Sequence, residues 1–162
     1  MYDYRFYDDA FGAWTMIHQT WHAMRRSEER RLANVKVTPE ELEVLWISGD
    51  YPGPLTPTEI SHAVFREAQT VSGLLDRMER KGLVRRVPRR KGRPFTEVQM
   101  TPRGQELCNR GKEADLAHIR KMMSRLSAEE LLQLQQLLRK VRQNVLQELN
   151  VELLPPPNWT SA

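Results

Sequence analysis

The sequence predicts a mainly α-helical chain with one small β-hairpin, an α+β fold, in 162 residues. Three observations support this. Apolar residues recur at three- and four-residue spacing along most of the chain, as in amphipathic helices. Thr or Ser followed three residues later by Glu marks several helix starts. Only residues 83–100 break the pattern, with two short strand-like runs on either side of a polar loop.

The first two helices are expected from Asp9 to about Asn34 and from Thr38-Pro39 to Gly49. The first carries a stripe at helical spacing: Phe11, Trp14, Ile17, His18, Trp21 and Met24. Such a stripe is more typical of a core or a dimer contact than of a ligand site. The second helix opens with a capping box and should place Trp46 in the core.

Two short helices follow between residues 56 and 82. Thr56, Pro57 and Glu59 open the first of them as a cap, a first-turn proline and a capping-box acid. Its expected core face is Ile60, Ala63 and Val64. The second helix buries Val71, Leu74, Leu75 and Met78 and ends at Gly82 in the left-handed conformation. Its opposite side holds small, polar or cationic residues: Gln69, Thr70, Ser72, Gly73, Asp76, Arg77 and Arg80.

Two strands, Leu83 to Val87 and Phe95 to Met100, are joined by the polar loop of residues 88–94. Residues 85–93 hold six cations and no acid: Arg85, Arg86, Arg89, Arg90, Lys91 and Arg93. A cluster of this kind needs a polyanion or solvent to screen it. Beside an exposed helix face, a nucleic-acid phosphate backbone is favoured over a merely solvated loop.

The basic excess is local. The net charge is only +4, yet residues 56–93 contain ten Lys or Arg against four acids. The single cysteine, Cys108, excludes an intrachain disulfide and fits a reducing compartment. An acidic N-terminus without an apolar run, and the lack of 18 consecutive apolar residues, predict a cytoplasmic protein with no membrane partner.

The C-terminal part predicts two more helices and a tail. One helix starts at Thr101-Pro102 and runs to about Leu126; the next starts at Ser127. The second has a seam of Leu131, Leu134, Leu138, Val141, Val145 and Leu149. This spacing predicts a dimer interface. The tail from Val151 to Ala162 contains three consecutive prolines and Trp159, and it either wraps the partner subunit or is disordered.

Three runs together resemble the winged helix-turn-helix of MarR-type transcriptional regulators: TPTEI at residue 56, TVSGLLDRMERKGLVRR at residue 70 and RPFTEVQMTPRG at residue 93. The resemblance implies a winged DNA-binding domain at residues 35–104, with a recognition helix at 69–81 and a wing at 88–94. It also implies a helical dimerisation region from residues 1–34 and 105–162. A homodimer of this type would bind double-stranded DNA at a pseudo-palindromic operator, and we expect it to act as a repressor.

The residues expected to contact DNA are Gln69, Thr70, Ser72, Gly73, Arg77, Arg86, Arg89, Arg90, Lys91 and Arg93. Two departures from the family pattern bear on them. Gly92, Arg93 and Pro94 stand where the family usually has Asp-Arg-Arg, so Arg93 inherits the wing tip. Gly73 stands where the family often has Arg. The glycine either lets the backbone approach DNA closely or removes a side-chain contact.

The resemblance also implies release by a small, often anionic aromatic effector. The candidates for its pocket are Trp14, His18, Trp21, Arg25 and Trp46, residues that would serve equally well as core. His18 and His22 have the i, i+4 spacing of metal ligands, but no Cys or acid cluster completes a site. Cys108 is expected to be a small packed residue. No cofactor, metal or enzyme activity is predicted. The rival functions are a winged-helix protein-interaction module and a ligand-independent DNA-binding protein.

Overall fold

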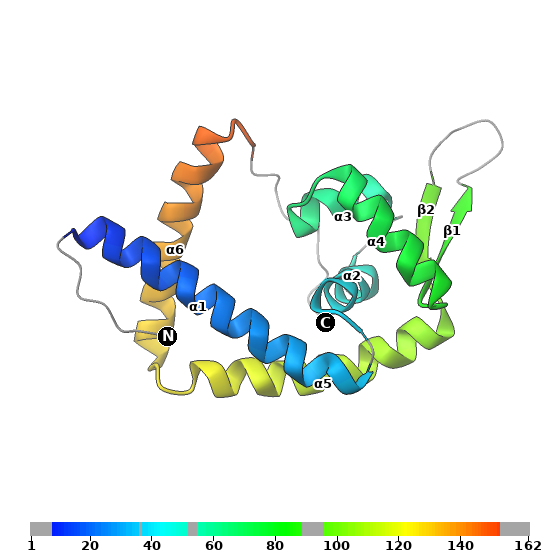
Figure 1. Cartoon of the computed structure of the whole chain (residues 1–162), viewed down its shortest axis with the longest axis horizontal. Helices are drawn as coiled ribbons and strands as arrows, with labels where there is room; N and C mark the ends of the chain where they lie inside the picture. Colours follow the sequence, from blue (N-terminus) through cyan, green and yellow to red (C-terminus); the bar gives the residue numbers. More distant parts are fainter. Residues whose placement is uncertain (1–7, 36, 52–54, 89–95, 153–162) are drawn as a thin grey trace. The chain divides into compact units, whose positions relative to one another are not determined.

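The computed structural model describes residues 8–35, 37–51, 55–88 and 96–152 (Figure 1). Its elements within these ranges are α1 (Asp9–Leu32), η1 (Ala33–Val35, a 3-10 turn), α2 (Pro39–Asp50), α3 (Pro57–Val64), α4 (Ala68–Arg80), β1 (Val84–Pro88), β2 (Thr96–Met100), α5 (Pro102–Met123) and α6 (Ala128–Glu148). The predicted α+β class is confirmed. The chain divides into two compact units between Val44 and Leu45.

Side-chain caps fix where the helices begin. The Ser127 hydroxyl accepts from the backbone N–H of Glu130 at 3.2 Å, and the Glu130 carboxylate accepts from the Ser127 N–H at 2.7 Å, a complete capping box. Thr38 with Glu41, and Thr101 with Gly104, cap α2 and α5. At α3 the predicted capping box is only half formed, because the Glu59 carboxylate accepts from the Thr56 hydroxyl instead of the Thr56 backbone.

The core of the second unit lies where α3 and α4 pack together, α4 packs on β1, and α3 and α5 contact β2. Its buried side chains include Leu45, Leu55, Ile60, Val71, Leu74, Leu75, Met78, Leu83, Val84, Val98 and Cys108. The expected core face of α3 is only partly correct. Ile60 is fully buried, Val64 is half-buried and Ala63 is exposed, because α3 ends at Val64 and its last turn extends beyond the core.

A Schellman motif separates α4 from β1. Gly82 has a φ of 66°, its N–H donates to the Glu79 carbonyl at 2.8 Å, and the Leu83 N–H donates to the Met78 carbonyl at 2.9 Å. Leu83 is therefore occupied in closing the helix, and β1 begins one residue later than predicted. The two strands are antiparallel, with Arg86 opposite Val98 and Pro88 opposite Thr96.

Two helices expose large apolar side chains in the single chain. On α1 these are Phe11, Trp14, Met16, Ile17 and Trp21; on α6 they are Leu132, Leu137, Leu138, Val141 and Val145. The aromatic stripe of α1 is thus not core within the chain, and no residue of α6 is buried. Trp46, expected in the core, is half-buried. Among the helices that the structure describes, none has the length and hydropathy to cross a membrane.

Candidate nucleic-acid interface

Helix α4 has one side in the core and one side in solvent. Val71, Leu74, Leu75 and Met78 are at most 2% exposed, as the spacing predicts. The opposite side presents Gln69, Thr70, Ser72, Asp76, Arg77 and Arg80, all exposed, and a half-buried Gly73. The helix is therefore held firmly by its apolar face while its hydrogen-bonding face is available to a partner.

A tight turn places the start of α4 next to α3. Phe65 adopts the left-handed conformation with a φ of 50° and ends α3. The Arg66 N–H donates to the Ser61 carbonyl at 3.1 Å, and the Ser61 hydroxyl donates to the Arg66 carbonyl at 2.5 Å. Glu67, the N-cap of α4, makes no side-chain capping bond. The first backbone N–H groups of α4 thus lack a side-chain cap, the arrangement that suits an anion at a helix N-terminus.

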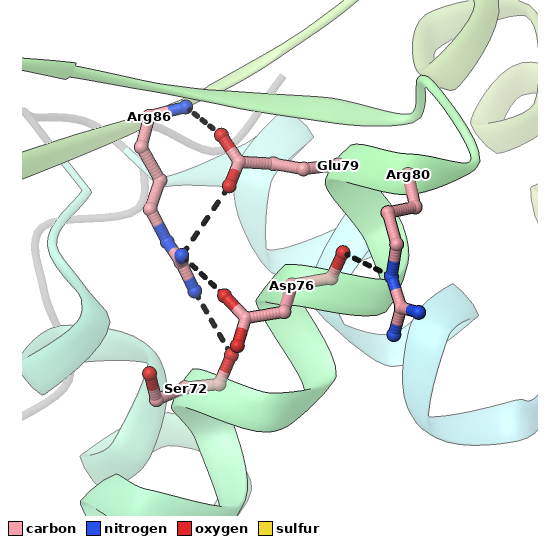
Figure 2. A network of polar contacts seen from close by, with 5 residues as sticks. All are labelled: Ser72, Asp76, Glu79, Arg80 and Arg86. Carbon is pink, nitrogen blue, oxygen red and sulfur yellow. Dashed lines mark hydrogen bonds and ion pairs between the residues drawn. The ribbon is translucent and has the colours of Figure 1, made fainter.

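Strand β1 carries two consecutive arginines, Arg85 and Arg86. Their side chains point to opposite faces of the hairpin, because successive side chains of a strand alternate between its two faces. Arg85 donates to Oε1 of Gln99 on β2, at 2.8 and 3.2 Å. Arg86 instead reaches α4, where its guanidinium lies 2.5 Å from Asp76 and 3.3 Å from Glu79 (Figure 2). These two neighbouring cations of the basic cluster, of which only Arg86 was predicted to contact DNA, therefore have different surroundings.

The predicted wing tip lies outside the described residues. Arg89, Arg90, Lys91 and Arg93 all fall between the strand ends Pro88 and Thr96. What the structure describes is the base of this hairpin, which packs on α4 through β1. The four cations belong to the loop that joins β1, which contacts α4, to β2, which contacts α3 and α5.

Four of the five effector candidates lie on α1, and the fifth, Trp46, lies on α2. On α1, Trp14 stacks on His18 with ring centroids 5.1 Å apart, and the Trp14 and Trp21 side chains are 57% and 56% exposed. Arg25 pairs with Glu40 and lies 3.6 Å from Glu29. It lines a shallow hollow of about 420 Å³ that the three aromatic candidates of α1 do not line.

Cys108 is a packed thiol, as expected. It is 3% exposed, and its Sγ lies 3.5 Å from the Leu45 carbonyl oxygen. Burial raises the pKa of the Cys108 thiol above its ordinary value of 9.0; the Lys112 ammonium opposes this rise and the Asp50 carboxylate adds to it. A thiol that stays protonated is a poor nucleophile.

We expect iodoacetamide to label Cys108 in the native protein at least about tenfold more slowly than in urea, because labelling needs local opening. The raised pKa also makes a stabilising contribution that is complete below pH 9 and is lost as the pH rises above it, since the unfolded thiol ionises first. Cys108→Ala should remove this alkaline loss of stability. Equal labelling rates in the native and unfolded states would contradict the assignment.

Comparison with known proteins identifies this arrangement. Residues 35–93 match the MarR family model. The HTH-type transcriptional regulator PecS of Dickeya dadantii (strain 3937) is 28% identical over 122 residues, 74% of each chain. These residues, 35–93, form a domain of the MarR family of transcriptional regulators.

Solved MarR-type structures share the fold. The S. aureus MepR–DNA complex superposes with a TM-score of 0.76 at 24% identity, covering 81% of this chain and 96% of that one. The organohalide-sensing RdhR-CbdbA1625 in its 2,4-dichlorophenol-bound form gives a TM-score of 0.77 at 21% identity, covering 86% and 82%. At these identities the structures support the fold and leave the site residues to be argued from this chain.

The sequence interpretation of this MarR-type chain missed the roles of Asp76 and Glu79. Asp76 was placed on the exposed face of α4 and Glu79 was counted only as an acid, yet both bind Arg86. A signal was present. Residues three apart share one side of a helix, so two acids on α4 form a pair that a cation from the following strand can bridge.

Proposed function

We propose that this MarR-type regulator is a homodimeric repressor that binds a pseudo-palindromic operator. The observation that carries the proposal is the division of α4 into a fully buried apolar face and an exposed polar face, next to a hairpin with a basic loop. In helix-turn-helix proteins such a helix enters the major groove, and a two-fold dimer places two of them about one DNA turn apart, roughly 34 Å. That MepR has been solved as a DNA complex supports the same use of the fold here.

The contacts divide by chemistry. Gln69, Thr70 and Ser72 lie in the first half of α4, the part of a recognition helix that reaches base edges, and their amide and hydroxyl groups can read them. Gly73 either lets the backbone of α4 approach the DNA closely or removes a side-chain contact with it. Arg77 would read or flank bases. The cations of the loop, Arg89, Arg90, Lys91 and Arg93, would bind phosphates and the adjacent minor groove.

Dimerisation is proposed for residues 1–34 and 105–162, with residues 35–104 binding DNA. Support comes from the apolar side chains that α1 and α6 leave in solvent, since a monomeric protein rarely exposes long apolar stripes. A second copy of the chain can cover them symmetrically.

Release by a small anionic aromatic compound is the proposed control, at a site for which the sequence nominates Trp14, His18, Trp21, Arg25 and Trp46. RdhR-CbdbA1625 is described as sensing organohalides and was solved with 2,4-dichlorophenol. In this chain the Trp46 indole N–H is buried and has no hydrogen-bond acceptor among the described residues. A phenolate or carboxylate would supply that acceptor.

The wing assignment is tested with Arg93→Ala. The variant should bind operator DNA more weakly, and the slope of log affinity against log salt should fall by about 0.9 for each lost phosphate contact, hence about 2 per dimer. Arg125→Ala removes an exposed cation from the α5–α6 turn, outside the proposed DNA surface, and should change neither quantity. Unchanged affinity and slope in Arg93→Ala would overturn the wing assignment.

A further inference from the structure

Among the described cations of the candidate interface, Arg86 makes the most hydrogen bonds and ion pairs. Its Nη1 lies 2.5 Å from Asp76 Oδ1 and 3.3 Å from Glu79 Oε2, and its Nη2 donates to the Ser72 carbonyl at 2.9 Å (Figure 2). Its backbone N–H donates to Glu79 Oε1 at 2.7 Å. The sequence predicted a phosphate contact at this position. The side chain instead binds three groups of one helix.

The three partners are spaced along α4. Ser72, Asp76 and Glu79 follow one another at intervals of four and three residues, so they lie on one side of the helix over about two turns. Arg86 comes from β1, whose next residues lead into the basic loop. One side chain therefore fixes both the lengthwise position and the rotation of α4 against the strand that carries the wing.

The contact has an electrostatic effect as well. Asp76 and Glu79 are two of only four acids among residues 56–93, and the Asp76 side chain is 54% exposed on the side proposed to meet DNA. Unpaired carboxylates there would repel phosphates. Arg86 offsets half of their charge from a position in which its own side chain is only 25% exposed.

We propose that Arg86 is a positioning residue, which fixes α4 in register with β1 and partly offsets the charge of Asp76 and Glu79, and which does not itself bind phosphate. The inference rests on the proposed DNA binding and assigns a role within it. Arginine suits this role because its planar fork binds several acceptors at fixed angles, whereas lysine carries the same charge at a single point. Base readout needs the helix placed accurately in the groove; general phosphate binding does not.

The test measures affinity for the operator and for a scrambled duplex at several salt concentrations. In Arg86→Lys, which keeps the charge but not the planar fork, the preference for the operator should fall about tenfold or more, the scale of one lost base contact. The affinity of Arg86→Lys for scrambled DNA and its salt slope should stay near wild type. Arg86→Gln should lose the same preference and should also bind both duplexes more weakly, because Asp76 and Glu79 are then uncompensated. Arg85→Gln is the matched control, since it removes the neighbouring cation on the other face of β1, and it should keep the operator preference.

A phosphate contact predicts a different pattern. Arg86→Lys would then keep the operator preference of wild type, while Arg86→Gln would weaken both duplexes equally and lower the salt slope by about 0.9 per site. An unchanged operator preference in Arg86→Lys or in Arg86→Gln would overturn the proposal.

Asp76→Ala/Glu79→Ala supplies a second test that leaves Arg86 in place. Losing two acids should strengthen binding if charge alone matters, whereas loss of positioning should lower the operator preference. Adding Arg86→Gln to this double variant should then cost little more, because coupled residues are not additive. An unchanged or increased preference in the double variant would contradict the inference. A thermal unfolding curve verifies that each variant is still folded at the assay temperature. If wild-type protein prefers no duplex, the proposed function has failed, independently of Arg86.

Discussion

Gly104→Ala is expected to lower the free energy of unfolding by about 3 kcal/mol or more, at the upper end of overpacking effects. An added Cβ would lie 2.1 Å from the Leu83 carbonyl oxygen, 3.1 Å from the Leu83 carbonyl carbon and 2.9 Å from Met100 Cγ. The Leu83 carbonyl cannot move freely, because it accepts hydrogen bonds from the N–H and hydroxyl of Thr101 at 3.0 and 3.1 Å. The backbone at Gly104 or at Leu83 must therefore shift to make room for the added methyl group.

Urea denaturation measures this loss, and Gly73→Ala is the control. A Cβ at Gly73 meets nothing within 4 Å. In the interior of α4, alanine should stabilise by about 1 kcal/mol over glycine. The same substitution at two helical glycines should therefore have opposite effects. A Gly104→Ala protein as stable as wild type would show that the packing of α5 on Leu83 is wrong.

The double variant Leu138→Glu/Val145→Glu is expected to be monomeric and to bind the operator at least about a hundredfold more weakly. A monomer binds only one half-site, whereas a dimer gains affinity because its two DNA-binding domains are linked. The two side chains are 41% and 47% exposed within one chain, and seven residues apart they lie on the same side of α6. Their replacement should leave the chain folded while placing charge in the proposed dimer interface.

Gln136→Glu/Gln143→Glu adds the same two charges on the opposite side of α6 and serves as the control. Light scattering coupled to size-exclusion chromatography gives the oligomeric state, and circular dichroism the helical content. The control should remain dimeric. A stripe variant that is still a dimer with full DNA affinity would exclude this side of α6 as the interface.

Local chemistry accounts for what the sequence predicted well. Thr56, Thr101 and Ser127 cap the helices they were expected to cap, and Gly82 adopts the left-handed conformation that ends α4. The buried face of α4 was predicted in full, because apolar spacing in a helix maps directly onto one side.

What was missed depends on long-range geometry. The capping role of Leu83 shortens β1, and Arg86 turns to α4 although its neighbour Arg85 does not. A run of cations does not show which of its members meets an acid from another element. The exposed aromatic residues of α1 illustrate the same limit, since helical spacing alone does not distinguish a core from an interface with a second subunit.

Binding to a randomised DNA pool tests the central claim most directly. The purified protein would select duplexes from the pool, and fluorescence anisotropy would compare the enriched sequence with its scrambled version at two salt concentrations. We expect the enriched sequence to be a pseudo-palindrome with half-sites about one turn apart, preferred by roughly a thousandfold or more, with affinity that falls steeply as salt rises. No enrichment, with weak and salt-insensitive binding to every duplex, would contradict a sequence-specific regulator and favour a protein-interaction module instead.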